Sequence, residues 1–244
     1  MTLHRTAAAD LLAMSADEMR TQLATSPEAA AGLLQAGAQA GLPEAQALYG
    51  QILLDGRGVA ADPVAALKWF LQAARSGHLM AINMVGRCHE KGWGTAIDKG
   101  VATLCYKAAA EGGLDWGMYN YGSALGLGSG IARDERAALD WFRKAAALGH
   151  AKSINFVGAF FEEGRLVPQD IDKAAACYKR AAEGDDFRGQ FNHARMLAQA
   201  GRPDEAAAWL MKADETCTPD FRQMMKTFLE ASPLPALRTL ASRL

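Results

Sequence analysis

Cysteine side chains are the first candidates for metal binding or nucleophilic chemistry in this chain, and their spacing favours neither role. They are Cys88, Cys105, Cys177 and Cys217. None stands two to four residues from another, which is the paired spacing of structural zinc sites. Four cysteines in 244 residues also fall short of a disulfide scaffold. We therefore predict reduced, mostly buried thiols that pack as small apolar side chains.

Other patterns that resemble catalytic or nucleotide-binding motifs are incomplete. The segment Gly126–Gly130 lacks the G-x-G-x-x-G spacing and follows an expected helix instead of a strand. Cys88, His89 and His193 do not form a metal-ligand pattern. The sequence contains neither a Walker A motif nor a G-x-S-x-G elbow. We therefore predict a chain that is not an enzyme, with no catalytic residue, no cofactor and no metal.

The remaining titratable candidates are read as parts of helix ends. His78 and His150 each follow a glycine that closes a helix, and we expect them at helix ends where a cation is mildly favoured. The acidic pair Glu162–Glu163 is interpreted as a solvated helix end.

The charge balance excludes several classes of partner. With 26 basic and 27 acidic residues the net charge is −1, so the chain has no general attraction for nucleic acid or anionic membrane. No stretch approaches the roughly 20 apolar residues that span a bilayer. Asp10 interrupts the one N-terminal run that resembles a signal peptide. We predict a cytoplasmic protein without a nucleic-acid partner and without membrane insertion.

A period of 36 residues organises most of the sequence. Its columns are Gly50, Gly86, Gly122 and Gly158; Gly56, Gly92, Gly128 and Gly164; Asp62, Asp98, Asp134 and Asp170; Ala66, Ala102, Ala138 and Ala174; Phe70, Tyr106, Phe142 and Tyr178; and alanine pairs that begin at Ala73, Ala109, Ala145 and Ala181. Six columns in one register over four ungapped copies indicate a repeat architecture.

Each copy predicts two helices, which we call A and B. Gly56 ends the A helix, and Asp62 followed by Pro63 begins the B helix. Gly50 lies in the middle of the A helix, where glycine costs about 1 kcal/mol relative to alanine. Its recurrence indicates that a second helix crosses there closely. The fourth copy has Leu166 in place of the second loop glycine, from which we infer that this glycine is not essential.

Hairpins of this kind bury their apolar stripes against one another. The predicted fold class is therefore all-α, an α/α superhelical solenoid of helix-turn-helix repeats. The predicted domains are N-terminal capping helices over residues 1–25, a solenoid over 26–215 (a half-unit at 26–41, four full units at 42–186 and a shortened unit at 187–215), and C-terminal capping helices over 216–244. The capping helices are expected from Ser15, which opens a capping box, to Ala24, and over Asp220–Ala231 and Ala236–Arg243.

The third copy carries a family resemblance. It contains Tyr121-Gly122, Gly128-Ser129-Gly130, Asp134, Ala138, Trp141-Phe142, Lys144-Ala145-Ala146 and Gly149-His150. This pattern resembles the Sel1-like repeat family, a relative of the tetratricopeptide repeats, although Cys105 and Cys177 replace its tryptophan. The resemblance implies a non-catalytic scaffold or adaptor for protein–protein interaction, which binds a peptide or partner protein in the concave groove formed by the A helices.

Certain A-helix positions are not needed by the expected core, namely those just before and just after the mid-helix glycine. They predict a partner-binding concave face made of Asn83, Arg87, Trp116, Tyr119, Asn120, Ser123, Asn155, Phe156, Phe191, Asn192 and Arg195. Asparagine both donates and accepts hydrogen bonds, arginine can hold a carboxylate, and aromatic rings can anchor a partner. For any single asparagine or aromatic, packing between repeats or in the core is the favoured interpretation, and the binding role stays open beside it at this stage.

Three alternative functions are compatible with the repeat. One is an enzyme that binds or hydrolyses β-lactams, an activity attached to some cysteine-rich relatives, but the chain lacks the Ser-x-x-Lys motif and the regular cysteine pairs. Another is an inhibitor or immunity-type partner of a toxin. The third is a module that only assembles with itself.

Overall fold

The computed structural model describes residues 25–233 and 235–241, and in these ranges the chain forms helices and no strand. The helices are α3 (Pro27–Gln39), α4 (Pro43–Asp55), α5 (Pro63–Arg75), α6 (Leu79–Lys91), α7 (Lys99–Glu111), α8 (Asp115–Leu127), α9 (Glu135–Ala147), α10 (Ala151–Glu163), α11 (Ile171–Glu183), α12 (Phe187–Gln199), α13 (Pro203–Thr216), α14 (Pro219–Glu230) and α15 (Pro235–Ala241). The predicted all-α class is confirmed. The A helices are α4, α6, α8, α10 and α12, and the B helices are the odd-numbered ones from α3 to α13.

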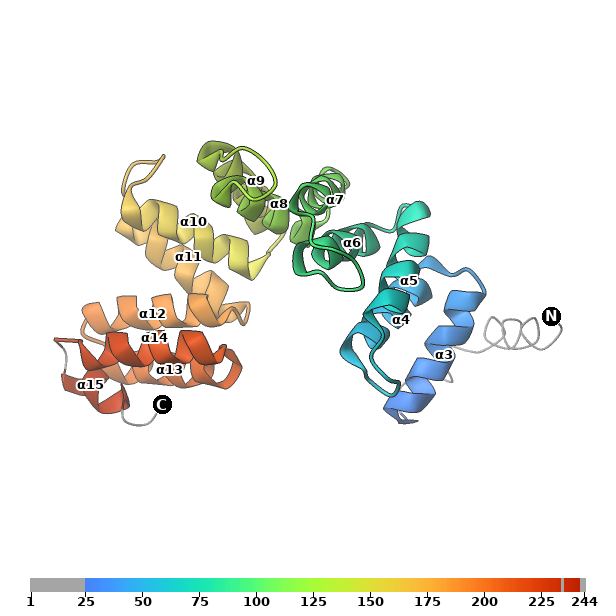
Figure 1. Ribbon diagram of the computed structural model, residues 1–244. Helices are drawn as coiled ribbons and strands as arrows, with labels where there is room; N and C mark the ends of the chain where they lie inside the picture. The colour runs from blue at the N-terminus through green and yellow to red at the C-terminus, as the bar shows by residue number, and fades with distance from the viewer. Residues whose placement is uncertain (1–24, 234, 242–244) are drawn as a thin grey trace. The chain divides into compact units, whose positions relative to one another are not determined.

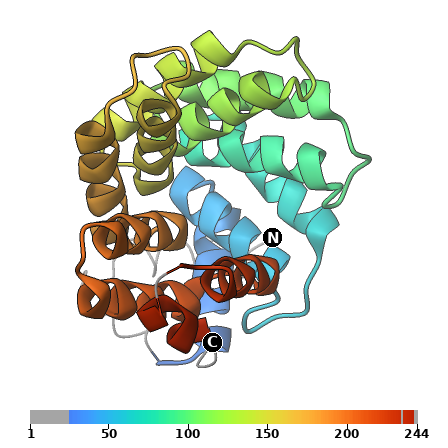
Figure 2. The same ribbon diagram turned by 90° about the vertical axis from the view of Figure 1, so that its left-hand side faces the viewer.

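The chain divides into two compact units, Met1–Asp134 and Glu135–Leu244, which we call unit 1 and unit 2. In unit 1 each helix from α3 to α8 packs on the next, and the A helices α6 and α8 also contact each other (Figure 1). In unit 2 the helices from α9 to α13 pack in the same order, and α10 contacts α12 (Figure 2). Each unit is therefore a stack of helical hairpins.

The helix boundaries follow from the residues that the sequence places there. The Asp62 carboxylate accepts a hydrogen bond of 2.9 Å from the backbone N–H of Ala65, which caps the start of α5. Asp98 and Asp170 cap α7 and α11 in the same way. Gly56 ends α4 with a left-handed backbone, φ 68°. These caps confirm the predicted turn between the A and B helices.

The glycine in the middle of each A helix makes room for the aromatic ring of the following B helix. A Cβ added to Gly86 would lie 2.7 Å from the ring of Tyr106, and one added to Gly158 would lie 2.8 Å from the ring of Tyr178. Both rings are buried. The close crossing that the recurrent glycine predicts is therefore present within both units.

The second glycine of the A–B loop lies against the backbone of the preceding B helix. In unit 1 these glycines are Gly58, Gly94 and Gly130. A Cβ on any of them would lie 2.0–2.2 Å from the carbonyl oxygen of the first residue of that helix, and each has a positive φ. The inference from Leu166 that this glycine is not essential is wrong for these loops, because no side chain fits there. Leu166 itself keeps the left-handed backbone, with φ 62°.

The expectation for His78 and His150 is also wrong in one respect. Both residues begin a helix, where a cation is disfavoured, instead of ending one. The Nδ1 atom of His78 accepts from the backbone N–H of Ala81 at 3.1 Å, and His150 Nδ1 accepts from that of Ser153 at 3.3 Å. Each imidazole therefore acts as a cap through an unprotonated Nδ1. Three residues separate the two helices at this turn, and the histidine is the last of them, so it lies directly before the helix that it caps.

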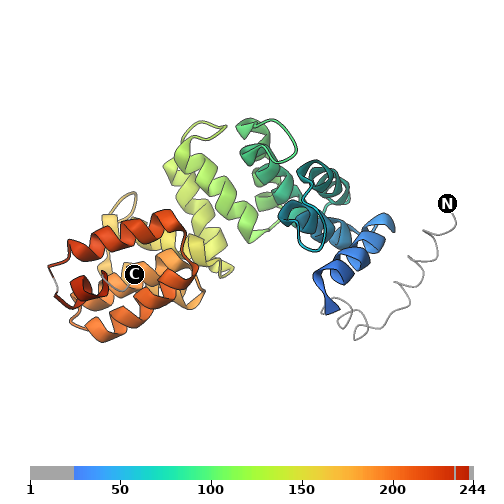
Figure 3. The same ribbon diagram turned by 60° about the horizontal axis from the view of Figure 1, so that its bottom comes forward.

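The C-terminal helices of unit 2 extend its core. Met225 and Leu229 of α14 are fully buried and join a cluster with Leu210 of α13 and Leu237 of α15. Figure 3 shows these C-terminal helices in orange to red. The expected helices at 220–231 and 236–243 are found one residue earlier, and the second ends at Ala241 in the described residues. The predicted N-terminal capping helix lies outside the described residues. The domain boundaries proposed from the sequence remain a prediction.

Candidate partner-binding face

The asparagines of the predicted face pair with each other across successive A helices. Within unit 1 the Asn120 side chain donates a hydrogen bond of 2.8 Å to Asn83 Oδ1, and within unit 2 Asn192 donates one of 2.9 Å to Asn155 Oδ1. Asn83 and Asn155 are buried, whereas Asn120 and Asn192 are half-buried. The pairs therefore tie α6 to α8 and α10 to α12, and a partner can reach mainly the second asparagine of each pair.

The aromatic residues of the predicted face differ in exposure. Phe191 is buried, with its ring centroid 5.6 Å from that of Phe221 on α14. The Phe156 ring stacks on Phe142 with centroids 4.9 Å apart. Trp116 is 39% exposed and meets the half-buried Tyr119 edge to face at 6.2 Å. Phe191 thus belongs to the core of unit 2, and Trp116 presents the largest accessible ring among these residues.

Arg195 is held by an internal carboxylate. Its Nη1 and Nη2 atoms donate to the two oxygens of Glu162 at 2.7 and 2.6 Å, and the Tyr178 hydroxyl donates to Glu162 at 2.7 Å. The hydrogen bonds from Arg195 hold the pKa of Glu162 below its usual value, while burial raises the pKa of Tyr178. Glu162, expected to be a solvated helix end, is instead the centre of a polar network that links α10, α11 and α12.

Arg87 has different neighbours in unit 1. Its guanidinium lies over the Trp93 ring, 5.1 Å from the centroid, and Nη1 lies 3.9 Å from the sulfur of Met84. Arg87 is half-buried, and no carboxylate within the described ranges forms an ion pair with it. Ser123 is half-buried, and its hydroxyl oxygen is buried without a hydrogen-bond partner among the residues that the structure describes.

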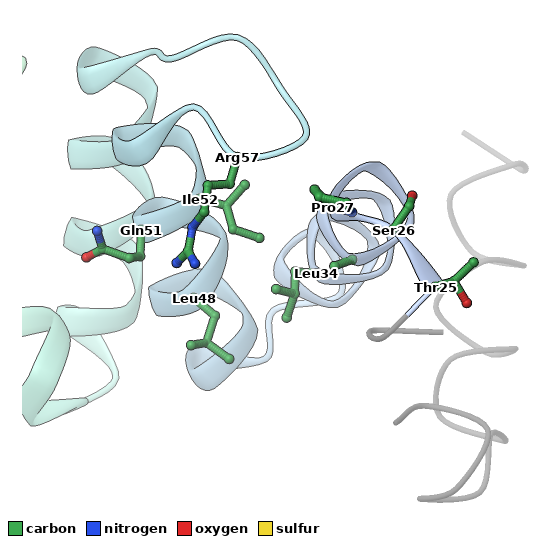
Figure 4. Close-up of a pocket in the computed structure, with 9 residues that line it drawn as sticks. Thr25, Ser26, Pro27, Leu34, Leu48, Gln51, Ile52 and Arg57 are labelled. Atoms are coloured by element: carbon green, nitrogen blue, oxygen red, sulfur yellow. The ribbon is translucent and has the colours of Figure 1, made fainter. Parts of the chain in front are cut away.

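A pocket of about 450 Å³ lies between α3 and α4 in unit 1 (Figure 4). Leu34 of α3 and Ile52 of α4 extend into it from opposite sides, and Leu48, Gln51 and Arg57 complete the α4 side. This pocket was not predicted from the sequence, because the positions around the mid-helix glycine were considered only from the second repeat onward. Leu48 and Gln51 occupy those same positions around Gly50 in the first repeat.

Four segments of the chain match the family model described as Sel1 repeat: residues 43–78, 79–114, 117–150 and 151–186. Together they cover more than half of the 244 residues. The chain belongs to the Sel1 repeat family. The family assignment and the α/α solenoid fold class predicted from the sequence are thereby confirmed.

Solved Sel1 repeat structures share this fold. A Sel1 repeat protein from Oxalobacter formigenes superposes with a TM-score of 0.77 at 21% identity, over 94% of this chain and 96% of that one. The protein c5321, a protective antigen present in uropathogenic Escherichia coli strains, has a TM-score of 0.69 at 22% identity, over 98% of this chain and 54% of that one. At such identities the likeness shows the fold alone.

A curated relative of this Sel1 repeat chain is the chitin synthase regulator SKT5 of Saccharomyces cerevisiae. The two are 28% identical over 130 residues, which are 52% of this chain and 19% of the yeast protein. The match therefore covers a small part of the relative.

Three of the four thiols of this Sel1 repeat protein, those of Cys88, Cys105 and Cys177, are poor nucleophiles in the folded state. All four cysteines are free, Cys88 is buried and the other three are half-buried. Burial raises the pKa of Cys88 to about 11 and also raises the pKa of Cys105 and of Cys177. Since the thiolate is the reactive form, these three side chains are unreactive near neutral pH. The described residues contain no group of three His, Cys, Asp or Glu side chains placed to hold a metal ion, and none of their helices is long and apolar enough to cross a bilayer.

The buried carboxyl of Asp186, at the start of α12, makes the stability of the fold depend on pH. Its Oδ2 accepts from the backbone N–H of Gly189 at 3.0 Å, while its buried Oδ1 has no partner in the described residues. Burial raises the pKa of Asp186, against the opposing effects of the Gly189 N–H, Arg188 and Lys152. A carboxyl with a raised folded-state pKa stabilises the fold below its unfolded pKa, and this contribution is lost as the pH rises through the folded value.

We therefore expect Asp186→Asn, which keeps the cap, to raise the free energy of unfolding by about 0.5–1 kcal/mol at pH 8. The gain over wild type should shrink as the pH falls through the folded-state pKa of Asp186 and below its unfolded pKa of about 3.9, where the carboxyl is protonated in both states. Urea unfolding at several pH values measures it. A difference that does not vary with pH would contradict the assigned role of the ionised carboxylate.

Proposed function

We propose that this Sel1 repeat chain is a non-catalytic cytoplasmic scaffold that binds a peptide or partner protein along the faces of its A helices. Sel1 repeats generally mediate protein–protein interaction, and the matching yeast relative bears the name of a regulator of an enzyme. No nucleic acid, cofactor or membrane takes part in this proposal.

The exposed indole of Trp116 is the observation that carries the proposal. It lies on the A helix α8, 39% exposed, beside Tyr119 and the half-buried Asn120. Interfaces draw much of their binding energy from tryptophan, tyrosine and arginine side chains, with neighbouring polar groups that can pair with a peptide backbone. A ring of this size that the helix stack leaves accessible supports a role in binding.

The buried asparagines are poor probes of this face, because Asn155 and Asn83 also tie the helices together. Trp116→Ala is the better variant, and Leu104→Ala is its matched control, since Leu104 is 68% exposed on the B helix α7 of the same unit. We expect Trp116→Ala to lower recovery of the partner protein from native cell extract about tenfold or more, and Leu104→Ala to leave it unchanged.

Quantitative mass spectrometry of affinity-purified complexes measures the recovery, and circular dichroism checks that both variants stay folded. Equal recovery with wild type and Trp116→Ala would remove α8 from the binding face. Turnover of a chromogenic β-lactam by the purified chain would contradict the non-catalytic assignment.

A further inference from the structure

Two arginines occupy the same place in the repeat but have opposite surroundings. Arg87 follows Gly86 on α6, and Arg195 follows Ala194, the equivalent position, on α12. Arg195 reaches back to Glu162 on the preceding A helix, and only 17% of its side chain is exposed. The position equivalent to Glu162 on the A helix before Arg87 is Leu54. Arg87 therefore lacks the internal carboxylate that neutralises Arg195.

The acidic residue nearest to Arg87 on its own helix does not replace that partner. Glu90 lies three residues further along α6, and its carboxylate forms an ion pair of 3.2 Å with Lys91. The Trp93 ring instead holds the Arg87 guanidinium from one side. A planar guanidinium that is already oriented and half-desolvated is well suited to hold a carboxylate by two parallel hydrogen bonds.

The pocket between α3 and α4 lies one repeat before Arg87. Gln51, which lines the pocket, stands at the same position after Gly50 as Arg87 stands after Gly86. The A helices α6 and α8 are in contact, and packed helices are about 8–10 Å apart, so we take this value as the order of the spacing between successive A helices. An extended chain covers that distance with about three residues. The pocket walls are mainly apolar, so they fit an aliphatic or aromatic side chain.

We propose that unit 1 binds a peptide that carries a carboxylate at Arg87 and, about three residues away, an apolar side chain in the α3–α4 pocket. This rests on the proposed function and names the chemistry of the partner. The carboxylate belongs to an Asp or Glu side chain or to the C-terminus of the partner.

Binding of full-length protein to an array of twelve-residue peptides, most of them random and some copied from residues 1–24, tests the proposal. Each peptide is present as free acid and as C-terminal amide, and with Asp and Glu retained or replaced by Asn and Gln. We expect wild type to prefer peptides with a carboxylate about tenfold or more. If the amide form abolishes binding, the C-terminus is the source, and if the Asn/Gln form does, a side chain is.

Arg87→Gln is expected to remove this preference while leaving the weaker binding of neutral peptides unchanged. Arg143→Gln is the charge-matched control, because Arg143 is an exposed B-helix residue paired with Asp140 in unit 2, and it should retain the preference. Leu48→Asp, which alters the pocket, should weaken binding of peptides with the apolar residue in place.

Equal binding of acid and neutral peptides, an equal loss of both in Arg87→Gln, or no bound peptide at all would overturn the proposal. Binding confined to array peptides copied from residues 1–24 would also overturn it, by assigning the pocket to the chain's own segment. Trp116→Ala separates the two proposals. If it loses the cellular partner while the peptide array gives any of these results, the scaffold function is supported and only the carboxylate recognition is contradicted.

Discussion

Gly94→Ala is expected to lower the free energy of unfolding of unit 1 by about 3 kcal/mol. Alanine in a left-handed conformation costs about 1 kcal/mol. The added Cβ would also lie 2.2 Å from the carbonyl oxygen of Pro63, so that backbone must move, at a further cost of about 1–3 kcal/mol. Urea unfolding followed by circular dichroism measures the loss, and hydrogen exchange of α5 and α6 localises it.

Gly77→Ala is the matched control for this prediction. Gly77 also has a positive φ, 80°, but an added Cβ would meet nothing within 4 Å. We expect a loss of only about 1 kcal/mol, from the backbone conformation alone. Equal losses in the two variants would mean that the contact of the loop with α5 contributes nothing.

Arg195→Met is expected to destabilise unit 2 by about 2 kcal/mol, because it leaves Glu162 without its counter-ion in a half-buried site. Methionine keeps most of the volume of the arginine stem, so the loss reports on the charge. The double variant Arg195→Met/Glu162→Leu should recover part of the stability, since two apolar side chains can replace an ion pair at little cost, while the Tyr178 hydroxyl still loses its acceptor. Urea unfolding of the two single variants and the double variant gives the coupling between the residues.

The same pair predicts a dependence on acid. The pKa of Glu162 is lowered in the folded state, chiefly by the hydrogen bonds from Arg195. Its stabilising contribution is therefore present above the unfolded pKa of about 4.3 and is lost as the pH falls through the folded value. Arg195→Met should therefore weaken the dependence of the free energy of unfolding on pH in this acidic range. A double variant no more stable than Arg195→Met alone, with an unchanged profile, would show that the network is not coupled.

The sequence predicted the fold well because each boundary is encoded locally. Asp62 with Pro63 begins a B helix whatever surrounds it, and Gly56 ends an A helix through its own backbone freedom. The recurrence of glycine every 36 residues indicates a close helix crossing at Gly86, and the structure shows that the ring of Tyr106 lies there. His78 was assigned to the wrong helix because it follows the glycine that closes α5, although it lies directly before the first residue of α6.

The binding face could be predicted only in outline. Arg87 and Arg195 look equivalent in the sequence, and what separates them is the residue that a preceding helix brings alongside, Glu162 or Leu54. Asparagine pairs likewise depend on neighbours 37 residues away, one more than the period. Such differences arise from tertiary contacts, which a pattern of residue types within one helix does not contain.

The loop glycines also bear on how a chain of this kind can change its length. Each of these loop glycines in unit 1 lies against the helix start of the copy immediately before it. Duplication of a 36-residue stretch would therefore supply both a new loop glycine and a new helix start for it to contact. An insertion of another length would move the glycine away from that helix start. Growth or shortening by whole copies is thus the route that leaves every junction intact, and it offers a way to build longer or shorter binding surfaces from this protein.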